Sequence, residues 1–451
     1  MRLLTRLSAF ILAFMLLVPA FAAAVEEEVD FYTETPYYLQ VKQHTDVENP
    51  FKNVVVRRTY PDTNNDEVDA VIRQMVDEMA EADRGLVPTN GRSVLCDLDV
   101  GAVIYRTGTS WMSFILLSQY SEEYTQRSMK YQTVVFDMET GARLSVADVI
   151  GDSSEGLRLI REAVSAQLNA YFPQLEAGTA ALEALLTDEA LINAPFSMSA
   201  ACMRISYRAD TIYADKHDTL MHVVIPYAQL KPYMTEKALE QTDNSRFKVI
   251  ALTFDDGPAT GYTKRCMNQL RNYAASATFF IVGERLAGNH YNVCREQNSA
   301  YALQSHSWKH EYAQNCTVDQ LFSWKQKFID QLNEMTGLAP SIMRAPGGRE
   351  TMLIRYDIGY PLVHWSIISG DAAEGKVDPY KIANYVMNAV KDGDIVLMHD
   401  IRSSVDVYVE NILENISRRG FMCVTVEELY MHAGIEMQPN EVYWSRTRIG
   451  D

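Results

Sequence analysis

The sequence lacks an excess of positive charge, is short of cysteine and has a single long hydrophobic run. Its 451 residues include 41 Lys and Arg against 59 Asp and Glu, so the formal net charge is −18. An acidic surface repels phosphate backbones and anionic lipids, which argues against a nucleic-acid partner and a membrane-surface role. Six cysteines are too few for a disulfide scaffold at this length. Cys294 and Cys316 could pair in an oxidising compartment, but the sequence does not define the connectivity.

The hydrophobic run lies at the N-terminus and predicts export. Basic residues precede the apolar stretch 7–18, and Pro19 then leads into small residues. This order is typical of a secretory signal peptide over residues 1–24, so we expect a protein that is secreted or retained in the cell envelope. An uncleaved membrane anchor is the alternative, because residues 8–25 are just long enough to be considered. Pro19 and the small residues favour cleavage.

Two domains are expected after the signal peptide. Residues 31–240 mix helix and strand patterns, including a helix over 154–172 and a hairpin turn at 139–141. No cluster of ligands or nucleophiles occurs there, which favours an α+β accessory domain. The polar stretch 235–245 is interpreted as a linker. Residues 246–432 then alternate between strand and helix patterns.

The alternating pattern predicts an α/β domain built on a parallel sheet, either open or closed into a barrel. Residues 247–254 are nearly continuously apolar, as expected for a strand that is buried on both faces. Thr317 with Gln320, and Asp378 with Pro379, are typical of helix N-termini. Further strands are expected to end at Met343, Ile368, Met398 and Val426.

Five short polar clusters follow predicted strands of this domain. The carboxyl edge of parallel strands is where barrels and open α/β sheets build active sites. Each cluster alone has an ordinary explanation, such as a turn, a solvated helix face or an ion pair at a strand end. Five clusters at one edge are harder to explain in that way. They lie at 253–258, 306–310, 344–348, 365–371 and 397–399.

Together the clusters can form a metal site. His306 and His310 are four residues apart, the spacing of one helical turn, so both imidazoles could reach one ion. A carboxylate would complete three ligands and leave a position open for water. Ser307 stands where the His-Glu-x-x-His motif has its catalytic glutamate, so the general base must come from elsewhere. Asp255 and Asp256 are the obvious source.

At this point residues 247–430 resemble the NodB-type polysaccharide deacetylases, carbohydrate esterase family 4. All five motifs of that family occur in order. The resemblance implies a distorted (β/α) barrel as the fold of the deacetylase domain, with the α+β domain before it. It also implies the following site residues: Asp255 as general base, Asp256, His306 and His310 as metal ligands, Arg344 orienting Asp255, His399 as general acid, and Leu397, Pro346, Gly347, Trp365 and Asp371 in substrate binding.

Two further details follow from the resemblance. The backbone N–H of Gly347 is expected to donate to the oxyanion, and Leu397 to line the pocket for the acetyl methyl group. The family usually has Trp-x-x-Asp-x-x-Asp-Trp in its fourth motif, whereas this chain has Ile368 at the first Asp and Ala372 at the final Trp. The support of Arg344 is therefore in question. From the residues alone, we also expect Asp400 to raise the pKa of its neighbour His399.

The N-terminal half is similar to RsiV-like extracytoplasmic domains. Residues 136–149 and 224–233 carry this resemblance. The same domain type precedes the deacetylase in PdaC-type peptidoglycan deacetylases. This combination implies an envelope protein that acts on or binds wall glycan.

The leading hypothesis is metal-dependent hydrolysis of N-acetyl groups on an extracellular glycan, with peptidoglycan as the first candidate. Zinc is the first candidate for the divalent metal, with cobalt, manganese or nickel as alternatives. Chitooligosaccharide deacetylation and xylan ester hydrolysis remain alternatives within the same chemistry. A non-catalytic lysozyme-binding or glycan-binding protein is the alternative from another class. An acetylated polysaccharide is the expected partner, and the sequence predicts no oligomeric state.

Overall fold

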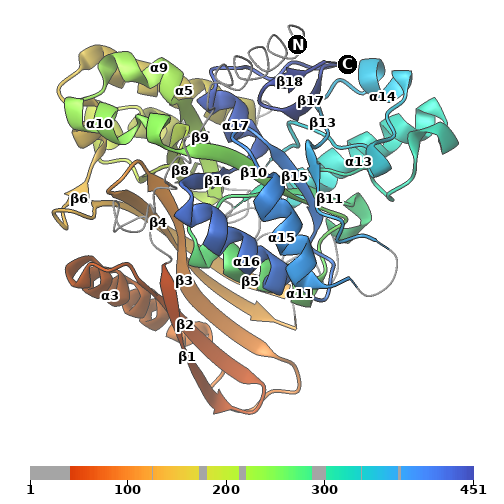
Figure 1. Ribbon diagram of the computed structural model, residues 1–451. Coiled ribbons are helices and arrows are strands. Elements are labelled where there is room, and N and C mark those ends of the chain that lie inside the picture. The colour runs from red at the N-terminus through yellow and green to blue at the C-terminus, as the bar shows by residue number, and fades with distance from the viewer. Residues whose placement is uncertain are drawn as a thin grey trace, which may run out of the picture.

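The computed structural model describes residues 41–123, 125–171, 180–212, 220–286, 301–336, 338–373 and 377–450. The signal peptide expected at 1–24 and the possible pairing of Cys294 lie outside these residues. Within them, no helix is both long and apolar enough to cross a membrane. Figure 1 shows two sheet-rich regions in contact, each with helices packed on it.

A six-stranded sheet begins the described chain, and its strands follow the order of the sequence. Strands β2 and β3 are parallel and the other neighbours are antiparallel. The strands are β1 (Lys42–Phe51), β2 (Val54–Asp62), β3 (Cys96–Thr107), β4 (Trp111–Glu122), β5 (Thr125–Asp137) and β6 (Arg143–Leu144). The predicted hairpin is confirmed, because Val135 pairs with Leu144 across the turn. Helix α3 (Asp66–Asp83) buries Val68, Ile72 and Val76 against this sheet, as the helical spacing of apolar residues requires.

A smaller antiparallel sheet follows, made of β7 (Phe196–Met198), β8 (Cys202–Arg208) and β9 (Leu220–Pro226). Helix α5 (Ser154–Tyr171) packs on β9 and confirms the helix expected at 154–172. The shorter helices of this region are α4 (Val146–Ile150), α6 (Ala180–Leu185), α7 (Asp188–Ile192), α8 (Ala209–Ile212), α9 (Tyr227–Leu230) and α10 (Glu236–Gln241). Helix α10 lies within the stretch 235–245, which was interpreted as the linker, and the boundary between the domains stays a prediction. Gln241 is buried there because its side-chain oxygen accepts from the backbone N–H groups of three residues, Thr109, Ser110 and Trp111.

The second domain is built on a curled parallel sheet with the strand order β12-β11-β10-β15-β14. Its strands are β10 (Lys248–Asp255), β11 (Thr278–Ile281), β12 (Ala302–Ser305), β13 (Leu362–Val363), β14 (Ile367–Ile368), β15 (Ile395–His399), β16 (Phe421–Val424), β17 (Val442–Ser445) and β18 (Arg448–Ile449). Its helices are α11 (Thr260–Asn272), α13 (Val318–Thr336), α14 (Met352–Asp357), α15 (Pro379–Ala389), α16 (Val405–Arg418) and α17 (Val426–His432). Short 3-10 turns lie at 84–86, 231–233, 244–246, 283–286, 313–315 and 346–348.

The curled sheet continues beyond β12 and turns back on itself. Single bridges link Ser305 to Met343 and Met343 to Leu362, and β13 then pairs with β17. A bridge from Ser445 to Asp394 returns to the start of β15. The expected distorted barrel is thereby confirmed. The expected strand end at Val426 is wrong by two residues, because Thr425 caps helix α17 and the strand stops at Val424.

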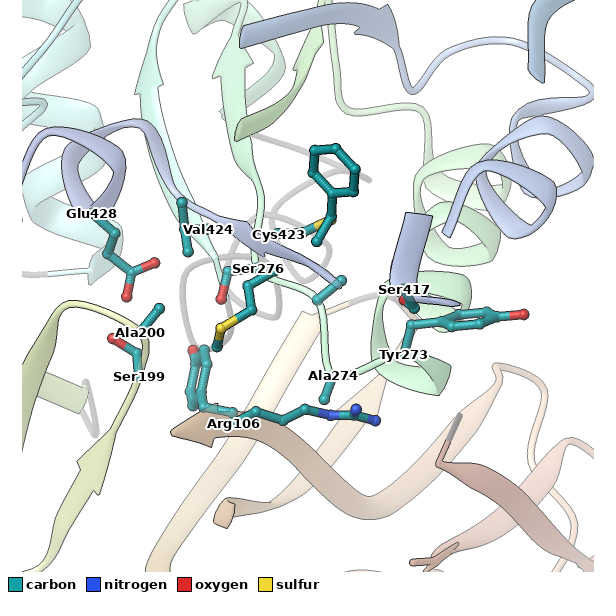
Figure 2. Close-up of a pocket in the computed structure, with 14 residues that line it drawn as sticks. Arg106, Ser199, Ala200, Tyr273, Ala274, Ser276, Ser417, Cys423, Val424 and Glu428 are labelled. Carbon is teal, nitrogen blue, oxygen red and sulfur yellow. The ribbon is translucent and has the colours of Figure 1, made fainter. Parts of the chain in front are cut away.

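The two domains share a hydrophobic core. Val103 and Ile115, from β3 and β4, lie in one buried cluster with Leu252 of β10 and Leu270 of α11. A small space of about 20 Å³ remains at this junction, between Arg106 and Ser199 on one side and Cys423 on the other (Figure 2). That volume holds about one water molecule and no sugar. The junction is therefore a packing interface.

Candidate metal and acid–base centre

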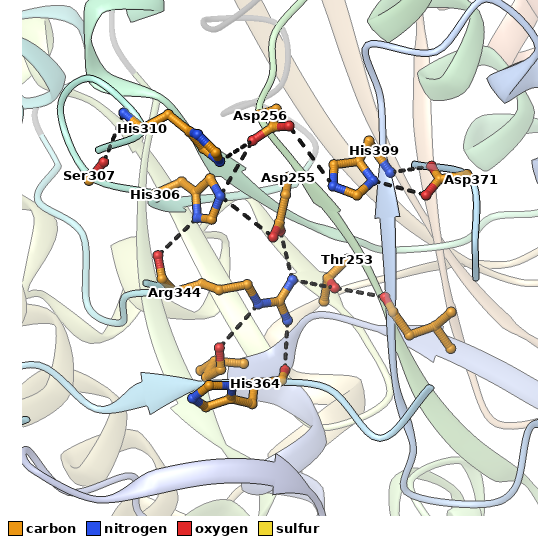
Figure 3. Close-up of polar contacts among 12 residues, drawn as sticks. Thr253, Asp255, Asp256, His306, Ser307, His310, Arg344, His364, Asp371 and His399 are labelled. Atoms are coloured by element: carbon orange, nitrogen blue, oxygen red, sulfur yellow. Dashed lines mark hydrogen bonds and ion pairs between the residues drawn. The ribbon is translucent and has the colours of Figure 1, made fainter. Parts of the chain in front are cut away.

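The polar clusters meet at the carboxyl edge of the curled sheet. Asp255 ends β10, His306 follows β12, and His399 ends β15, which pairs directly with β10. Arg344 follows the Met343 bridge at the same edge. Figure 3 shows these side chains pointing toward one another. The tertiary fold brings together every acid, base and ligand candidate that the sequence analysis named.

Asp256, His306 and His310 form a group whose ligand atoms all lie within 4.8 Å of one another. Asp256 Oδ1 is 3.4 Å from His306 Nε2 and 3.0 Å from His310 Nε2. That oxygen is buried and faces both imidazoles, which is the arrangement expected of a metal ligand. Two imidazole nitrogens and one carboxylate oxygen fit zinc and related divalent ions. The donor set therefore fits a divalent metal.

The hydrogen bond of His306 supports this assignment. Its Nδ1 lies 2.9 Å from the backbone carbonyl of Arg344, to which it can only donate. Nε2, which faces Asp256, is then left with its lone pair free to bind an ion. The ring is almost fully buried. Its orientation is consequently set by the carbonyl.

His306 and His310 approach each other from a loop and not from one turn of a helix, which their spacing had suggested. Residues 306–310 form an irregular loop, in which Ser307 and His310 have left-handed φ values of 65° and 58°. The His310 N–H donates to Ser307 Oγ at 3.0 Å and closes this turn. Asp256 also has a positive φ of 70°. Such conformations are costly away from glycine and cluster at functional sites.

The charges in this group stabilise one another. Burial alone would raise the pKa of Asp256, but the two histidines outweigh it and the net shift is downward. The hydrogen bond from His310 to Asp256 raises the pKa of His310 despite its partial burial. The carboxylate is therefore ionised over the whole neutral range.

Asp255 is held by Arg344. The Nη1 atom of Arg344 donates to Asp255 Oδ1 at 2.7 Å and also to Thr253 Oγ1 at 2.7 Å. The other Asp255 oxygen, Oδ2, lies 3.7 Å from His306 Nε2 and faces the histidines. Asp255 is 3% exposed and Arg344 is fully buried. One oxygen is thus anchored while the other points into the centre.

Backbone carbonyls complete the support of Arg344. Its Nε donates to Val363 at 3.1 Å and its Nη2 to His364 at 2.8 Å. Burial lowers the pKa of Arg344 and Asp255 opposes that shift. Ile368, at the position where the resembling family has Asp, is 52% exposed. The hydrogen bonds that would replace this missing Asp in supporting Arg344 come from the backbone carbonyls of Val363 and His364. The sequence could not indicate them, because every residue has a backbone carbonyl.

His399 is held by Asp371. Its Nδ1 lies 2.9 Å from Asp371 Oδ1, and its backbone N–H donates to Oδ2 at 2.7 Å. The Tyr408 hydroxyl donates to the same Oδ2 at 3.0 Å. Burial opposes protonation of His399, but the bond and charge of Asp371 outweigh it, so the pKa of His399 is raised. His399 Nε2 remains directed at the centre, 3.9 Å from Asp256 Oδ2.

Asp371 and Asp400 make contacts that differ from those expected from the sequence. Asp371 was grouped with substrate binding, yet its side chain is buried beneath His399. Asp400, expected to raise the pKa of His399, instead accepts a hydrogen bond from Thr263 Oγ1 at 2.5 Å. Full burial raises the pKa of Asp400 to about 7, so it is a weak source of charge. The partner of His399 lies 28 residues before it in the chain, where adjacency gives no signal.

The other candidates line the same edge. Leu397 is 5% exposed and lies beside Thr253 in the β10–β15 ladder. Pro346 is buried, whereas Gly347 is exposed. Gly347 has φ +62°, and a Cβ there would come within 2.9 Å of the Tyr312 ring, so only glycine fits. Trp365 is half-buried over Arg344.

Comparisons with known proteins agree on one family. Residues 242–359 match the family model of polysaccharide deacetylases. A peptidoglycan-N-acetylglucosamine deacetylase of Bacillus cereus is 34% identical over 197 residues, which are 41% of this chain and 90% of that protein. The peptidoglycan-N-acetylglucosamine deacetylase PgdA of Listeria monocytogenes is 32% identical over 204 residues, which are 44% of this chain. The match covers only 42% of that Listeria protein.

Among solved structures, a family 4 acetyl xylan esterase from Clostridium thermocellum in complex with a cobalt ion is similar to this chain. It is 26% identical, and the match covers 45% of this chain and 100% of that one. The TM-score is 0.43.

Proposed function

Because this chain belongs to the polysaccharide deacetylase family, we propose that it removes N-acetyl groups from an extracellular glycan and releases acetate. The convergence of Asp256, His306 and His310 with Asp255 and His399 carries this proposal. The Bacillus and Listeria relatives are deacetylases of peptidoglycan, which makes peptidoglycan the first candidate substrate. Such a substrate requires an enzyme exported to the envelope, in agreement with the predicted signal peptide.

We assign Asp256, His306 and His310 as the ligands of a divalent metal, with zinc first and cobalt, manganese or nickel as alternatives. When bound, such an ion would polarise the acetyl carbonyl and lower the pKa of a water molecule. His310 is the most exposed of the three, with a side chain 40% exposed, so the group of ligands is accessible from solvent on its side.

Asp255 takes the role of general base. Its Oδ1 is occupied by Arg344, so Oδ2 accepts the proton of the attacking water. The buried guanidinium keeps the carboxylate in place as that proton arrives. Gly347 supplies a backbone N–H to the oxygen that becomes negatively charged, and its positive φ allows the close approach.

His399 takes the role of general acid. Its Nδ1 is bonded to Asp371, so the proton on Nε2 is the one transferred to the leaving nitrogen. An amine is a poor leaving group without that proton. Leu397, one residue before Met398 on β15, would face the acetyl methyl group, while Pro346 and Trp365 would contact the sugar.

Acetate release from three substrates tests the proposal: N-acetylated peptidoglycan, chitooligosaccharide and acetylated xylan. The full chain, loaded with zinc or cobalt, should release acetate from peptidoglycan faster than from the other two. Chelation should abolish the release and added metal should restore it. A metal-loaded, folded protein that released acetate from none of them would refute the proposed activity. Faster release from acetylated xylan would indicate that the substrate is an O-acetyl ester and not an N-acetyl amide.

A further inference from the structure

The C-terminal hairpin packs against the strand that supports Arg344. Strands β17 and β18 pair with each other, and β17 runs parallel to β13 with Tyr443 opposite Val363. The backbone N–H of His364 donates to the Tyr443 carbonyl at 2.8 Å. This hairpin lies beyond residue 432, where the sequence analysis ended the domain. It nevertheless forms part of the barrel wall beside the centre.

Trp444, on β17, stacks on His364. The two ring centroids are 4.1 Å apart and the ring planes differ by 15°. Arg448 lies over the Trp444 ring at 4.3 Å, and the indole N–H donates to the Gly450 carbonyl at 3.2 Å. The indole is therefore held from within its own hairpin. A held ring of this size can fix the position of the ring stacked on it.

His364 is also enclosed on its remaining sides. Its Nε2 lies 3.1 Å from Glu350 Oε2, and only 4% of the residue is exposed. Gly348, with φ +64°, passes so close that a Cβ would lie 3.2 Å from the imidazole. The stack with Trp444 is thus one wall of a closed compartment. Removing the indole would leave His364 free to move toward the hairpin.

The backbone of His364 is linked to Asp255 through hydrogen bonds of Arg344. Its carbonyl accepts from Arg344 Nη2 at 2.8 Å, and the carbonyl of Val363 accepts from Nε at 3.1 Å. The third nitrogen, Nη1, donates to Asp255. Since the Ile368 side chain offers no acceptor, these two carbonyls orient the guanidinium together with Thr253 and Asp255.

We propose that Trp444 is a positioning residue of the deacetylation reaction. By stacking on His364 it holds the carbonyl groups that orient Arg344, and Arg344 in turn holds Asp255. The inference rests on the proposed role of Asp255 as general base. The C-terminal hairpin is on this view a part of the catalytic unit.

Four variants test the proposal on the full metal-loaded chain. Trp444→Ala should lower kcat for acetate release by about 3- to 10-fold, the range of a lost aromatic stack, with KM and metal content unchanged. Trp444→Phe keeps a ring and should recover to within about 2-fold. Trp444→Leu keeps apolar volume without a ring and should behave like Ala, which covers the case in which the Ala variant does not fold. Ile449→Ala, an exposed residue of the same hairpin, is the matched control and should match wild type.

The same Trp444 substitution made in an Arg344→Lys protein distinguishes a positioning role of Trp444 from a general loss of stability. Arg344→Lys replaces the guanidinium by a single ammonium group, which cannot serve both carbonyls and Asp255 in the same geometry, so adding Trp444→Leu to it should lower kcat by less than about 2-fold. Equal losses in both backgrounds, or a Leu variant as active as wild type, would overturn the proposal. Amide hydrogen exchange across 342–364 gives a readout independent of activity. Faster exchange in Trp444→Leu than in Trp444→Phe is expected even if the proposed activity fails, and unchanged exchange would refute the positioning role.

Discussion

Asp371→Asn gives the sharpest test of the acid half of the centre. Asn has the same shape as Asp but no charge, so the side chain can keep its place beneath His399. The perturbed contact joins His399 Nδ1 to Asp371 Oδ1 at 2.9 Å, between side chains that are 13% and 1% exposed. At this burial, water screens the interaction weakly. The main expected effect is therefore electrostatic.

The magnitude follows from the loss of one charged hydrogen bond. Hydrogen bonds to charged groups contribute about 1.5–3 kcal/mol, and one pKa unit corresponds to about 1.4 kcal/mol. The pKa of His399 should therefore fall in Asp371→Asn, because the hydrogen bond and the charge that raise it against burial are lost. In the native protein the pKa is raised, so the protonated acid persists above the ordinary range. Without Asp371 only burial and the more distant carboxylates remain, and the acid form is lost at lower pH.

The assay is the pH dependence of kcat/KM for an N-acetylated oligosaccharide, with metal content measured on the same samples. Asp371→Asn should move the alkaline limb to lower pH and cost about 10- to 100-fold on that side, with a smaller loss in mild acid. Tyr408→Phe removes a hydrogen bond to the same carboxylate but no charge, and should cost less than about 10-fold without moving the limb as far. An unmoved alkaline limb in Asp371→Asn would refute this account of the acid.

Three further outcomes are expected. His306→Ala or His310→Ala should lose metal and acetate release together, since three ligands leave none to spare; retained stoichiometric metal in elemental analysis would contradict the assignment. Asp255→Asn should keep its metal and lose about 100- to 10,000-fold in kcat, and metal loss would make Asp255 a ligand instead. Glu428→Gln leaves Arg204 buried without its counter-charge and should lower the free energy of unfolding in urea by about 3–5 kcal/mol. Burial would raise the pKa of Glu428, but the charge of Arg204 outweighs it and the net shift is downward. The native pair is therefore stabilising at neutral pH, and this stabilisation is lost as the pH falls through the lowered pKa. The variant should lack this dependence of stability on acid pH.

The features that could be predicted from the sequence depend on residues that are close together along the chain. The apolar run 247–254 became the central strand β10, and Asp378 caps helix α15 as its position before Pro379 indicated. Thr317 and Gln320 exchange the two hydrogen bonds of a capping box. The resemblance to polysaccharide deacetylases is likewise confirmed, because its motifs are short and contiguous. The likeness of residues 31–240 to RsiV-like domains stays a prediction.

The contacts that were not predictable depend on atoms that residue types do not specify. Arg344 is oriented by the carbonyls of residues 363 and 364, and any residue carries a carbonyl. The partner of His399 is Asp371, which reaches it only because β14 pairs with β15. His306 and His310 converge through left-handed residues in a loop, a conformation that the four-residue spacing does not indicate.

The stretch 235–245 shows why polar composition alone does not predict local structure at the expected linker. Its polar residues suggested a solvated linker, but a polar residue can also be buried when every polar atom finds a partner. Gln241 accepts from three backbone N–H groups at the turn between β3 and β4, and Asn244 donates to the Ala200 carbonyl. On either side of this segment, Val103 and Leu252 belong to one core. We therefore expect a chain cut at residue 246 to expose part of that core and to have a lower free energy of unfolding than the full chain.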